Sequence, residues 1–314
     1  MRGPRGVVDD PEVQAWLETL PDAKQQPNLV FAAARWHGLA APAPYEALRS
    51  VLLGDDGAVR GTILTRATQT NEAGRLATLT PVFALAAAGR PVALLEVGAS
   101  AGLCLYPDRW RYRWHTAEGV RAAGPPDGVG PVLECAVTGP VPLPEELPTV
   151  VWRGGIDLNP LDVTAEDDRR WLLTLVWPEH DDRREQLARA IDVARSDPPD
   201  VRRGDLFELL PARLEEARAA VGSDGVVVVF HSAVVAYLEE ADRARFDRTM
   251  RGAGRGRPLP LGEQRGPPRP PHRDGDRPGA AGRAVRARAR RSLRRAHPRA
   301  RPVPHLVVTP TTGP

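Results

Sequence analysis

A turn of small residues that directly follows an apolar run is the feature of the chain best suited to chemistry. The run 92–97 carries the acid Glu96, and Gly98, Ser100 and Gly102 then alternate with alanines. Small side chains let backbone N–H groups approach a bound ligand closely and aim the next element at it. The dinucleotide pattern G-x-G-x-x-G requires glycine at positions 100 and 103, where serine and leucine stand, so the spacing disfavours NAD.

His231 is a second candidate, because it directly follows the apolar run 226–230. A histidine in that place can act as a general base near neutral pH. The alternative is a structural histidine that forms hydrogen bonds at the end of a strand. The sequence leaves both interpretations open.

A dense polar cluster precedes the next apolar helix along the chain. Its members are Arg66, Thr68, Gln69, Thr70, Asn71, Glu72 and Arg75. Helix capping by a threonine, with an acid near the positive helix end, explains part of the cluster. Because a cap needs only one or two such residues, the cluster is also a candidate substrate site. The substrate-binding candidates are Arg66, Gln69, Asn71 and Glu72.

The elements that position these residues change type at about residue 91. Residues 1–90 read as a helical N-terminal subdomain, with Asp10 as a helix cap before Pro11 and further helices at 28–37, 45–53 and 69–88. From residue 91 onwards, short apolar runs alternate with amphipathic helices, which is typical of a parallel α/β sheet. The predicted strands are 92–97, 150–157, 201–204 and 226–230, and the predicted helices are 165–176, 183–195, 206–221 and 233–250.

An insertion at 103–147 separates the first two predicted strands. It starts with alternating aromatic residues and continues with many prolines and glycines. The alternation of Trp110, Tyr112 and Trp114 favours a half-buried hairpin face over a stacking platform for bases.

Residues 251–314 differ in composition from the rest of the chain. They hold 16 arginines and three acids, and 21 of the 64 residues are proline or glycine. Such a segment buries too little apolar surface to offset its ordering entropy, which predicts a disordered tail. Its net charge of +13 leaves −10 for residues 1–250 out of the total of +3. A nucleic-acid partner would therefore bind the tail alone, and we do not expect one.

The cysteine count and the apolar runs exclude several classes of protein. Two cysteines, Cys104 and Cys135, build neither a disulfide framework nor a zinc site by themselves. No apolar run approaches the roughly 18 to 20 residues of a membrane span, and the first ten residues lack the apolar core of a signal peptide. We expect a soluble, cytoplasmic protein with no membrane partner and no metal.

Several long runs resemble one family of proteins. They are QPNLVFAA (26–33), RATQTNEAGR (66–75), LLEVGASAGLCLYPDRWRYR (94–113), WRGGIDLNPLDV (152–163), LVWPE (175–179) and VVFHSAVVAYL (228–238). On these runs the chain resembles an uncharacterised bacterial family, domain of unknown function 2332, over about residues 11–250. That resemblance brings no known activity.

The turn and the later strands also resemble class I S-adenosylmethionine-dependent methyltransferases. LLEVGASAG (94–102) is similar to their first motif, with Ser100 where glycine is usual. The run to Asp157, GDLF (204–207) and VVVVFHSAVVAYL (226–238) follow in the order of their later motifs. The resemblance implies a Rossmann-like fold, with Glu96, Gly98, Ser100 and Gly102 at the methionyl part of the cofactor.

The same resemblance implies roles for three later residues. Asp157 would accept both ribose hydroxyls, Asp205 would contact the adenine, and His231 with the polar cluster would face the methyl acceptor. A loop-capping role is the alternative for Asp157. The 59 positions from Gly98 to Asp157 exceed the usual spacing of roughly 20, so either the insertion forms a flap or Asp157 is misassigned.

The tail has a second interpretation. Lys24 is the only lysine among 43 lysines and arginines, a bias that indicates a GC-rich gene, and such a gene read out of frame yields mainly Arg, Pro, Gly and Ala. We hypothesise that the residues beyond about Met250 derive from a frameshift. Methyltransferase sheets place a fifth strand beside the fourth, so its loss would leave 226–230 at an open edge. Pro302 and Pro304 make the run around 303–309 a poor replacement.

The leading prediction is an α/β protein with three parts: a helical cap (1–90), a methyltransferase-type Rossmann domain (91–250) and a tail (251–314). It would bind S-adenosylmethionine and transfer the methyl group to a small molecule. In-line displacement needs alignment and exclusion of water more than a base, so no catalytic triad is required. The alternative is a non-catalytic Rossmann-like ligand-binding protein, and a nucleotide-dependent oxidoreductase ranks third.

Overall fold

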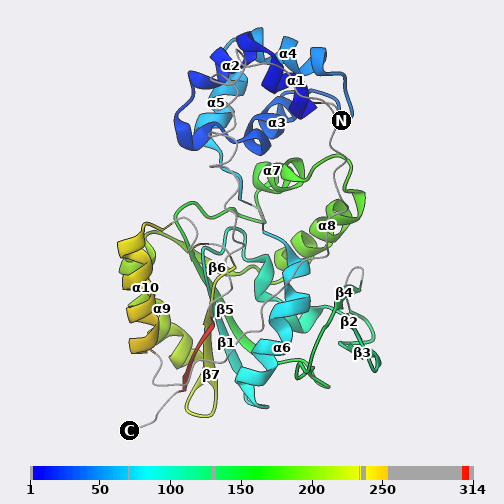
Figure 1. Cartoon of the computed structure of the whole chain (residues 1–314). Helices are drawn as coiled ribbons and strands as arrows, with labels where there is room; N and C mark the ends of the chain where they lie inside the picture. Colours follow the sequence, from blue (N-terminus) through cyan, green and yellow to red (C-terminus); the bar gives the residue numbers. More distant parts are fainter. Residues whose placement is uncertain are drawn as a thin grey trace. The chain divides into compact units, whose positions relative to one another are not determined.

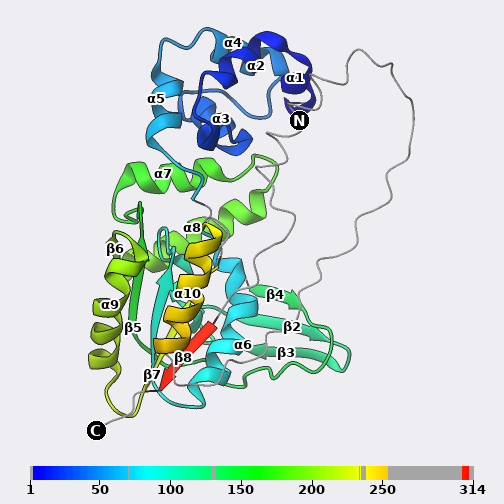
Figure 2. The ribbon, with the colours of Figure 1, turned by 60° about the vertical axis from the view of Figure 1, so that its left-hand side comes forward.

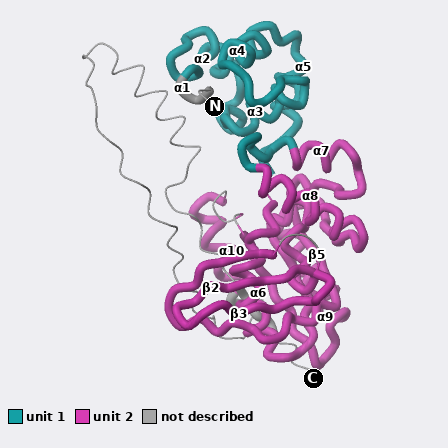
Figure 3. Tube along the Cα trace, turned by 90° about the vertical axis from the view of Figure 1, so that its right-hand side faces the viewer, with its two compact units in different colours: residues 1–69, 174–180, 262–301 teal, residues 70–173, 181–261, 302–314 magenta. Residues whose placement is uncertain are grey.

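The computed structural model describes residues 3–69, 71–128, 132–232, 234, 238–253 and 306–310 (Figure 1). These residues form two compact units, which Figure 3 distinguishes by colour. Unit 1 holds residues 3–69 and 174–180, and unit 2 holds the other described residues. The boundary after Gln69 places the last helix of the expected N-terminal cap with the sheet. No helix of the described part has both the length and the apolar composition for a membrane crossing.

Unit 1 is helical. Its α-helices are α1 (Gly3–Asp9), α2 (Pro11–Glu18), α3 (Pro27–Trp36), α4 (Tyr45–Leu53) and α5 (Ala58–Thr65). The predicted cap of α2 is confirmed, because the Asp10 carboxylate accepts the N–H groups of Glu12 and Val13 at 3.0 and 3.2 Å. Burial raises the pKa of Asp10, but the bonds from the Val13 N–H, Tyr45 and Arg49 outweigh it and hold the pKa below its usual value. Helix α5 was missed by the sequence analysis.

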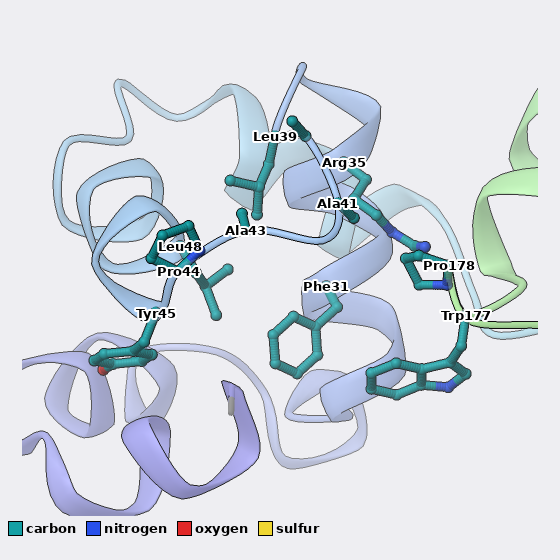
Figure 4. Close-up of a pocket in the computed structure, with 11 residues that line it drawn as sticks. Phe31, Arg35, Leu39, Ala41, Ala43, Pro44, Tyr45, Leu48, Trp177 and Pro178 are labelled. Carbon is teal, nitrogen blue, oxygen red and sulfur yellow. The ribbon is translucent and has the colours of Figure 1, made fainter. Parts of the chain in front are cut away.

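The segment 174–180, which is distant in sequence, completes the core of unit 1. Trp177 packs on Phe31 of α3 with ring centroids 5.4 Å apart. The Arg35 guanidinium donates to the carbonyl oxygens of Val176, at 3.0 Å, and of Thr174. Mainly apolar side chains of α3, the connection 39–44, α4 and this segment line a cavity of about 30 Å³ (Figure 4). That volume suits a water molecule rather than a ligand.

Unit 2 is built on a five-stranded sheet in the order β6-β5-β1-β7-β8. Its strands are β1 (Val92–Val97), β5 (Val150–Asp157), β6 (Asp200–Arg203), β7 (Val226–Phe230) and β8 (Leu306–Pro310). The first four along the chain run parallel, and β8 is antiparallel to β7. Counted along the chain, the order 3-2-1-4 of the parallel strands is that of doubly wound α/β folds. The predicted parallel α/β sheet is confirmed.

Helices cover both faces of this sheet. Helices α9 (Leu206–Val221) and α10 (Glu240–Ala253) lie on one face, and α6 (Leu76–Ala87) lies on the other (Figures 1 and 2). Alternate residues of β1 and β7 pack with α9 and α10 in one buried cluster, as the period of two in a strand requires. On the α6 face, Phe83 meets Phe230 with ring centroids 4.8 Å apart.

The insertion contains the predicted hairpin and one further strand. Strands β2 (Tyr112–Thr116) and β3 (Gly119–Ala123) pair antiparallel, and β4 (Leu133–Ala136) pairs parallel with β2. Tyr112 and Trp114 are buried and stack at 5.2 Å, whereas Arg113 between them is exposed. The half-buried aromatic face is therefore confirmed.

Two helices differ clearly from the sequence prediction. In place of the single helix expected at 69–88, a short 3₁₀ turn, Ala73–Arg75, precedes α6. Asn71, at the polar start of the expected helix, instead forms hydrogen bonds with Ala99 and Leu103. The helix expected at 233–250 is described as α10 from Glu240. Two further helices, α7 (Glu166–Leu175) and α8 (Asp181–Ser196), connect β5 to β6 near their predicted positions.

The C-terminal segment is described in part. Residues 254–305 and 311–314 lie outside the described residues, so the disordered tail and its frameshift origin stay predictions. The described strand β8 pairs with all five residues of β7. The expectation of an open edge at 226–230 is therefore wrong, because a strand from beyond residue 303 covers that edge.

Candidate functional site

The predicted site residues of unit 2 gather mainly where the parallel strands end. In register, Glu96 of β1 lies between Gly155 of β5 and Phe230 of β7. The order of the strands reverses between β1 and β7, and the crevice outside such a switch point is the usual ligand site of doubly wound folds. The turn 98–102 leaves β1 at this edge.

The turn has a left-handed backbone at three alternate residues. The φ angles of Gly98, Ser100 and Gly102 are 73°, 52° and 70°. Glycine adopts this region readily, whereas a residue with a Cβ atom rarely does. Ser100 thus has a backbone conformation that glycine adopts more readily than serine.

Two of these positions also lack room for a side chain. A Cβ atom on Gly98 would lie 2.6 Å from the Val234 side chain, and one on Gly102 would lie 2.7 Å from Pro199. Val234 belongs to the segment that follows β7, so this segment borders the turn. Glycine is required here by both conformation and packing.

The N–H groups of the turn donate within the protein. Those of Gly98 and Ala99 bind the Ile156 carbonyl at 2.8 and 3.2 Å, and that of Ser100 binds the Asp157 carboxylate at 2.8 Å. A pyrophosphate seated on this turn would compete with these bonds. The geometry therefore agrees with the sequence pattern in disfavouring a dinucleotide.

Asp157 holds the turn as well as ending β5. Its Oδ2 accepts the N–H of Ser100, and its Oδ1 accepts the N–H of Asn159 at 2.8 Å. The loop-capping role is thus confirmed. The side chain is half-buried at the carboxyl edge, and its role as a ribose ligand stays a prediction.

Asn71 joins the two ends of the turn. Its Nδ2 donates to the Ala99 carbonyl and its Oδ1 accepts the N–H of Leu103, both at 2.8 Å. The residue is 3% exposed. A side chain that uses a donor and an acceptor on the turn affects a ligand chiefly by shaping the turn, so its predicted substrate contact stays untested.

The other predicted substrate residues fall in different places. Arg66 and Gln69 belong to unit 1, where the Arg66 guanidinium lies over the Trp36 ring at 5.3 Å. Glu72 belongs to unit 2 and forms an ion pair with Arg183. The polar cluster of the sequence is therefore divided between the two units.

Asp205 and His231 have evident structural roles. Asp205 caps α9 by accepting the Phe207 N–H at 2.7 Å. His231 is 1% exposed, and its ring meets Phe246 of α10 edge-on at 5.6 Å. A general base must reach the proton that it removes, so the catalytic role of His231 stays a prediction, as does the adenine contact of Asp205.

A chain of polar contacts crosses the switch point. Arg75 Nη1 donates to Ser232 Oγ at 2.8 Å, and Ser232 Oγ donates to Glu96 Oε1 at 3.3 Å. Ser232 was missed by the sequence analysis. The signal for it was its position just after the strand 226–230, beside His231.

Glu96 is fully buried in this chain of contacts, with an exposed fraction of 0%. Burial raises the pKa of Glu96 to about 8; Arg75 and the Ser232 bond oppose this, and the charge of Asp157 adds to it. The carboxyl group is therefore mostly protonated at pH 7. Its Oε2 atom has no hydrogen-bond partner among the described residues.

Comparison with known proteins gives a family. Over residues 4–304 the chain matches the model of a family described as an uncharacterized protein conserved in bacteria, DUF2332. The chain belongs to this family. The resemblance to this family read from the sequence is confirmed, and the match also covers residues 251–304 of the C-terminal segment. No curated protein and no solved structure matches the chain, so the function of this DUF2332 protein has to be argued from its site.

Proposed function

We propose that unit 2 binds S-adenosylmethionine at the carboxyl ends of β1, β5 and β7 and transfers its methyl group to a small molecule. The observation that carries the proposal is the turn 98–102. It follows the first strand of a 3-2-1-4 parallel order, and its three alternate left-handed residues fall at the small-residue positions of the first motif, with Ser100 at the position where glycine is usual.

The polar groups around the turn suit the cofactor. Asp157 is half-buried at the end of the neighbouring strand, where a ribose can approach its carboxylate. Buried polar atoms almost always have partners, yet Glu96 Oε2 and Ser100 Oγ have none among the described residues. A bound polar molecule at the end of β1 supplies partners for such atoms.

Methyl transfer from S-adenosylmethionine requires few catalytic groups from the protein. S-adenosylmethionine, when bound, supplies a methyl group on a sulfonium, from which it leaves readily. The residues of this site need only to orient the acceptor in line and exclude water. This explains how the site can function with His231 buried against Phe246.

Calorimetric titration with S-adenosylmethionine and S-adenosylhomocysteine tests the proposal. We expect micromolar binding by the full chain and at least about tenfold weaker binding by Asp157→Asn, because a charged hydrogen-bond acceptor is lost. Asp55→Asn is the matched control, since Asp55 also accepts two backbone N–H groups, at 2.9 Å each, but lies in unit 1.

The outcomes separate the candidate functions. Absence of binding to a folded sample, or equal binding by Asp157→Asn and wild type, would contradict the proposed cofactor site. Binding without methyl transfer to any acceptor would favour the non-catalytic ligand-binding alternative.

A further inference from the structure

Arg75 of unit 2 directs its guanidinium at the Ser232 hydroxyl rather than at a carboxylate of the described residues. Its guanidinium is half-buried and donates from Nη1 to Ser232. Among the described residues, no carboxylate lies within ion-pair distance of it. By contrast, Arg153 is held by Asp108 at 2.7 Å and Arg213 by Asp200 at 2.7 Å. A guanidinium has five N–H groups, and among the described residues that of Arg75 donates only to Ser232.

Glu96 does not supply the missing negative charge at neutral pH. Arg75 reaches it only through the Ser232 hydroxyl. Its pKa of about 8, which burial sets, keeps it mostly protonated. In that form Oε2 carries an O–H donor, and Oε2 has no partner among the described residues.

Neither group therefore has a negatively charged acceptor among the described residues. A carboxylate satisfies both, because it pairs with the planar fork of an arginine and also accepts from an O–H group. We propose that Arg75 and Glu96, joined through Ser232, bind a carboxylate group of the ligand. The inference deepens the proposed function and rests on it for the identity of the site, but its chemistry can be tested separately.

A carboxylate at this place has two possible sources, the amino-acid end of the cofactor or the methyl acceptor. Decarboxylated S-adenosylmethionine, which lacks only the carboxylate, tests the first source. Succinate, which carries carboxylates without an amine or a nucleoside, tests for the shared chemistry alone.

The groups that face Glu96 fix how binding depends on pH. They are Arg75 before α6, Ser232 after β7, Asp157 at the end of β5 and Cys104 after the turn. Burial raises the pKa of the Cys104 thiol well above its usual value, so the thiol stays neutral. Above about pH 8, Glu96 loses its proton, which removes a donor and adds a repelling charge. Carboxylate affinity should then fall by up to about tenfold for each further pH unit.

The experiment compares four full-length proteins: wild type, Arg75→Gln, Glu96→Gln and the control Arg90→Gln. Arg90 is exposed at the other end of α6, where it donates to the Ala87 carbonyl. Calorimetry compares the affinity for S-adenosylmethionine with that for its decarboxylated analogue. The rise in melting temperature on addition of succinate, at constant ionic strength, reports succinate binding. Arg75→Lys keeps the charge but not the planar fork of the arginine. The unfolding curve of each variant shows whether a loss of binding comes from a folding defect.

We expect wild type and Arg90→Gln to bind the carboxylate ligand at least about tenfold more tightly than Arg75→Gln, with Arg75→Lys between them. Glu96→Gln, whose amide also donates a hydrogen bond, should bind the carboxylate ligand as tightly as wild type does at pH 6.5. Its affinity should not decrease above pH 8, because glutamine does not titrate. A preference for S-adenosylmethionine over the analogue assigns the carboxylate to the cofactor. If S-adenosylmethionine and its analogue bind equally well and succinate stabilises the protein, the carboxylate belongs to the methyl acceptor.

The results also separate this inference from the proposed function. Succinate stabilisation that needs Arg75, without any binding of S-adenosylmethionine, would support the carboxylate site and contradict the cofactor. If neither ligand distinguishes Arg75→Gln from wild type, the carboxylate site is overturned, whether or not S-adenosylmethionine binds.

Discussion

Ser100 has a backbone conformation that is costly for serine, and its hydroxyl has no hydrogen-bond partner among the described residues to offset that cost. A residue with a Cβ atom in the left-handed region costs of order 1 kcal/mol or more relative to glycine. Such strain commonly persists at functional sites. The hydroxyl is therefore better explained by a ligand than by stability.

Ser100→Gly is expected to stabilise the folded protein by about 1 kcal/mol, because it removes the strain and breaks no side-chain bond. Urea unfolding measures the change. Ala88→Gly provides the comparison, since Ala88 has a φ of 48° at the end of α6, away from the turn. A loss of stability in Ser100→Gly alone would show that the hydroxyl has a structural partner.

Glu96 should make the folded protein less stable as the pH rises. Its pKa is about 8 when folded, against about 4.5 for an unburied glutamate. Between these values the folded state holds a proton that the unfolded chain has lost, so raising the pH favours unfolding. The loss from pH 4.5 to 8 is of the order of 4 kcal/mol.

Unfolding free energies of wild type and Glu96→Gln across this window measure the effect. Subtracting the variant removes the contribution of all other groups, and the difference should change in favour of the variant as the pH rises. A difference that stays constant with pH would mean that Glu96 titrates normally.

At the scale of elements, Asn71 secures the turn from a segment outside the sheet. Its two bonds reach Ala99 and Leu103, on either side of Ser100 and Gly102. The residues before α6 thus shape the site without belonging to any strand of the sheet.

Asn71→Ala is expected to lower the free energy of unfolding by about 2–4 kcal/mol, because it leaves a buried carbonyl and a buried N–H without partners. It should also weaken ligand binding at the turn. Chemical denaturation checks the first effect, with Asn159→Ala as control at the half-buried neighbour of Asp157. Equal losses in the two variants would argue against a special role for Asn71.

The strands were predictable from sequence because short apolar runs alternate with amphipathic helices from residue 91 onwards. Three of the four predicted strands have the observed bounds, and the fourth is offset by one residue. The polar cluster was harder to interpret, since helix capping and pinning of a turn require the same residue types. Nothing local marks the boundary after Gln69 or the membership of 174–180 in unit 1, because both depend on contacts distant in sequence. Ser232 was missed for the same reason, as its partners Arg75 and Glu96 are more than 130 positions away.

At the scale of the whole molecule, β8 covers the edge of the sheet that β7 would otherwise form. It brings the last described residues of the chain alongside β7, all five residues of which are buried. An uncovered apolar strand at an edge is a template for pairing with other chains.

A chain truncated after residue 305 is therefore expected to self-associate with increasing concentration, whereas one truncated after residue 310 should behave as the full chain does. Light scattering at matched concentrations measures this. If both truncated chains stay monomeric and melt at the same temperature, β8 contributes nothing to the protection of β7.

The membership of segment 174–180 in unit 1 sets a limit on the order of folding during synthesis. Helices α1–α5 leave the ribosome first, but Trp177 and the carbonyls that Arg35 binds are made only after residues 70–173. At about 5–20 residues per second, the N-terminal helices wait roughly 5–20 s for them. During that interval Phe31 has no Trp177 to pack against, and the nascent chain depends on chaperones or on its own partial core to avoid non-native contacts.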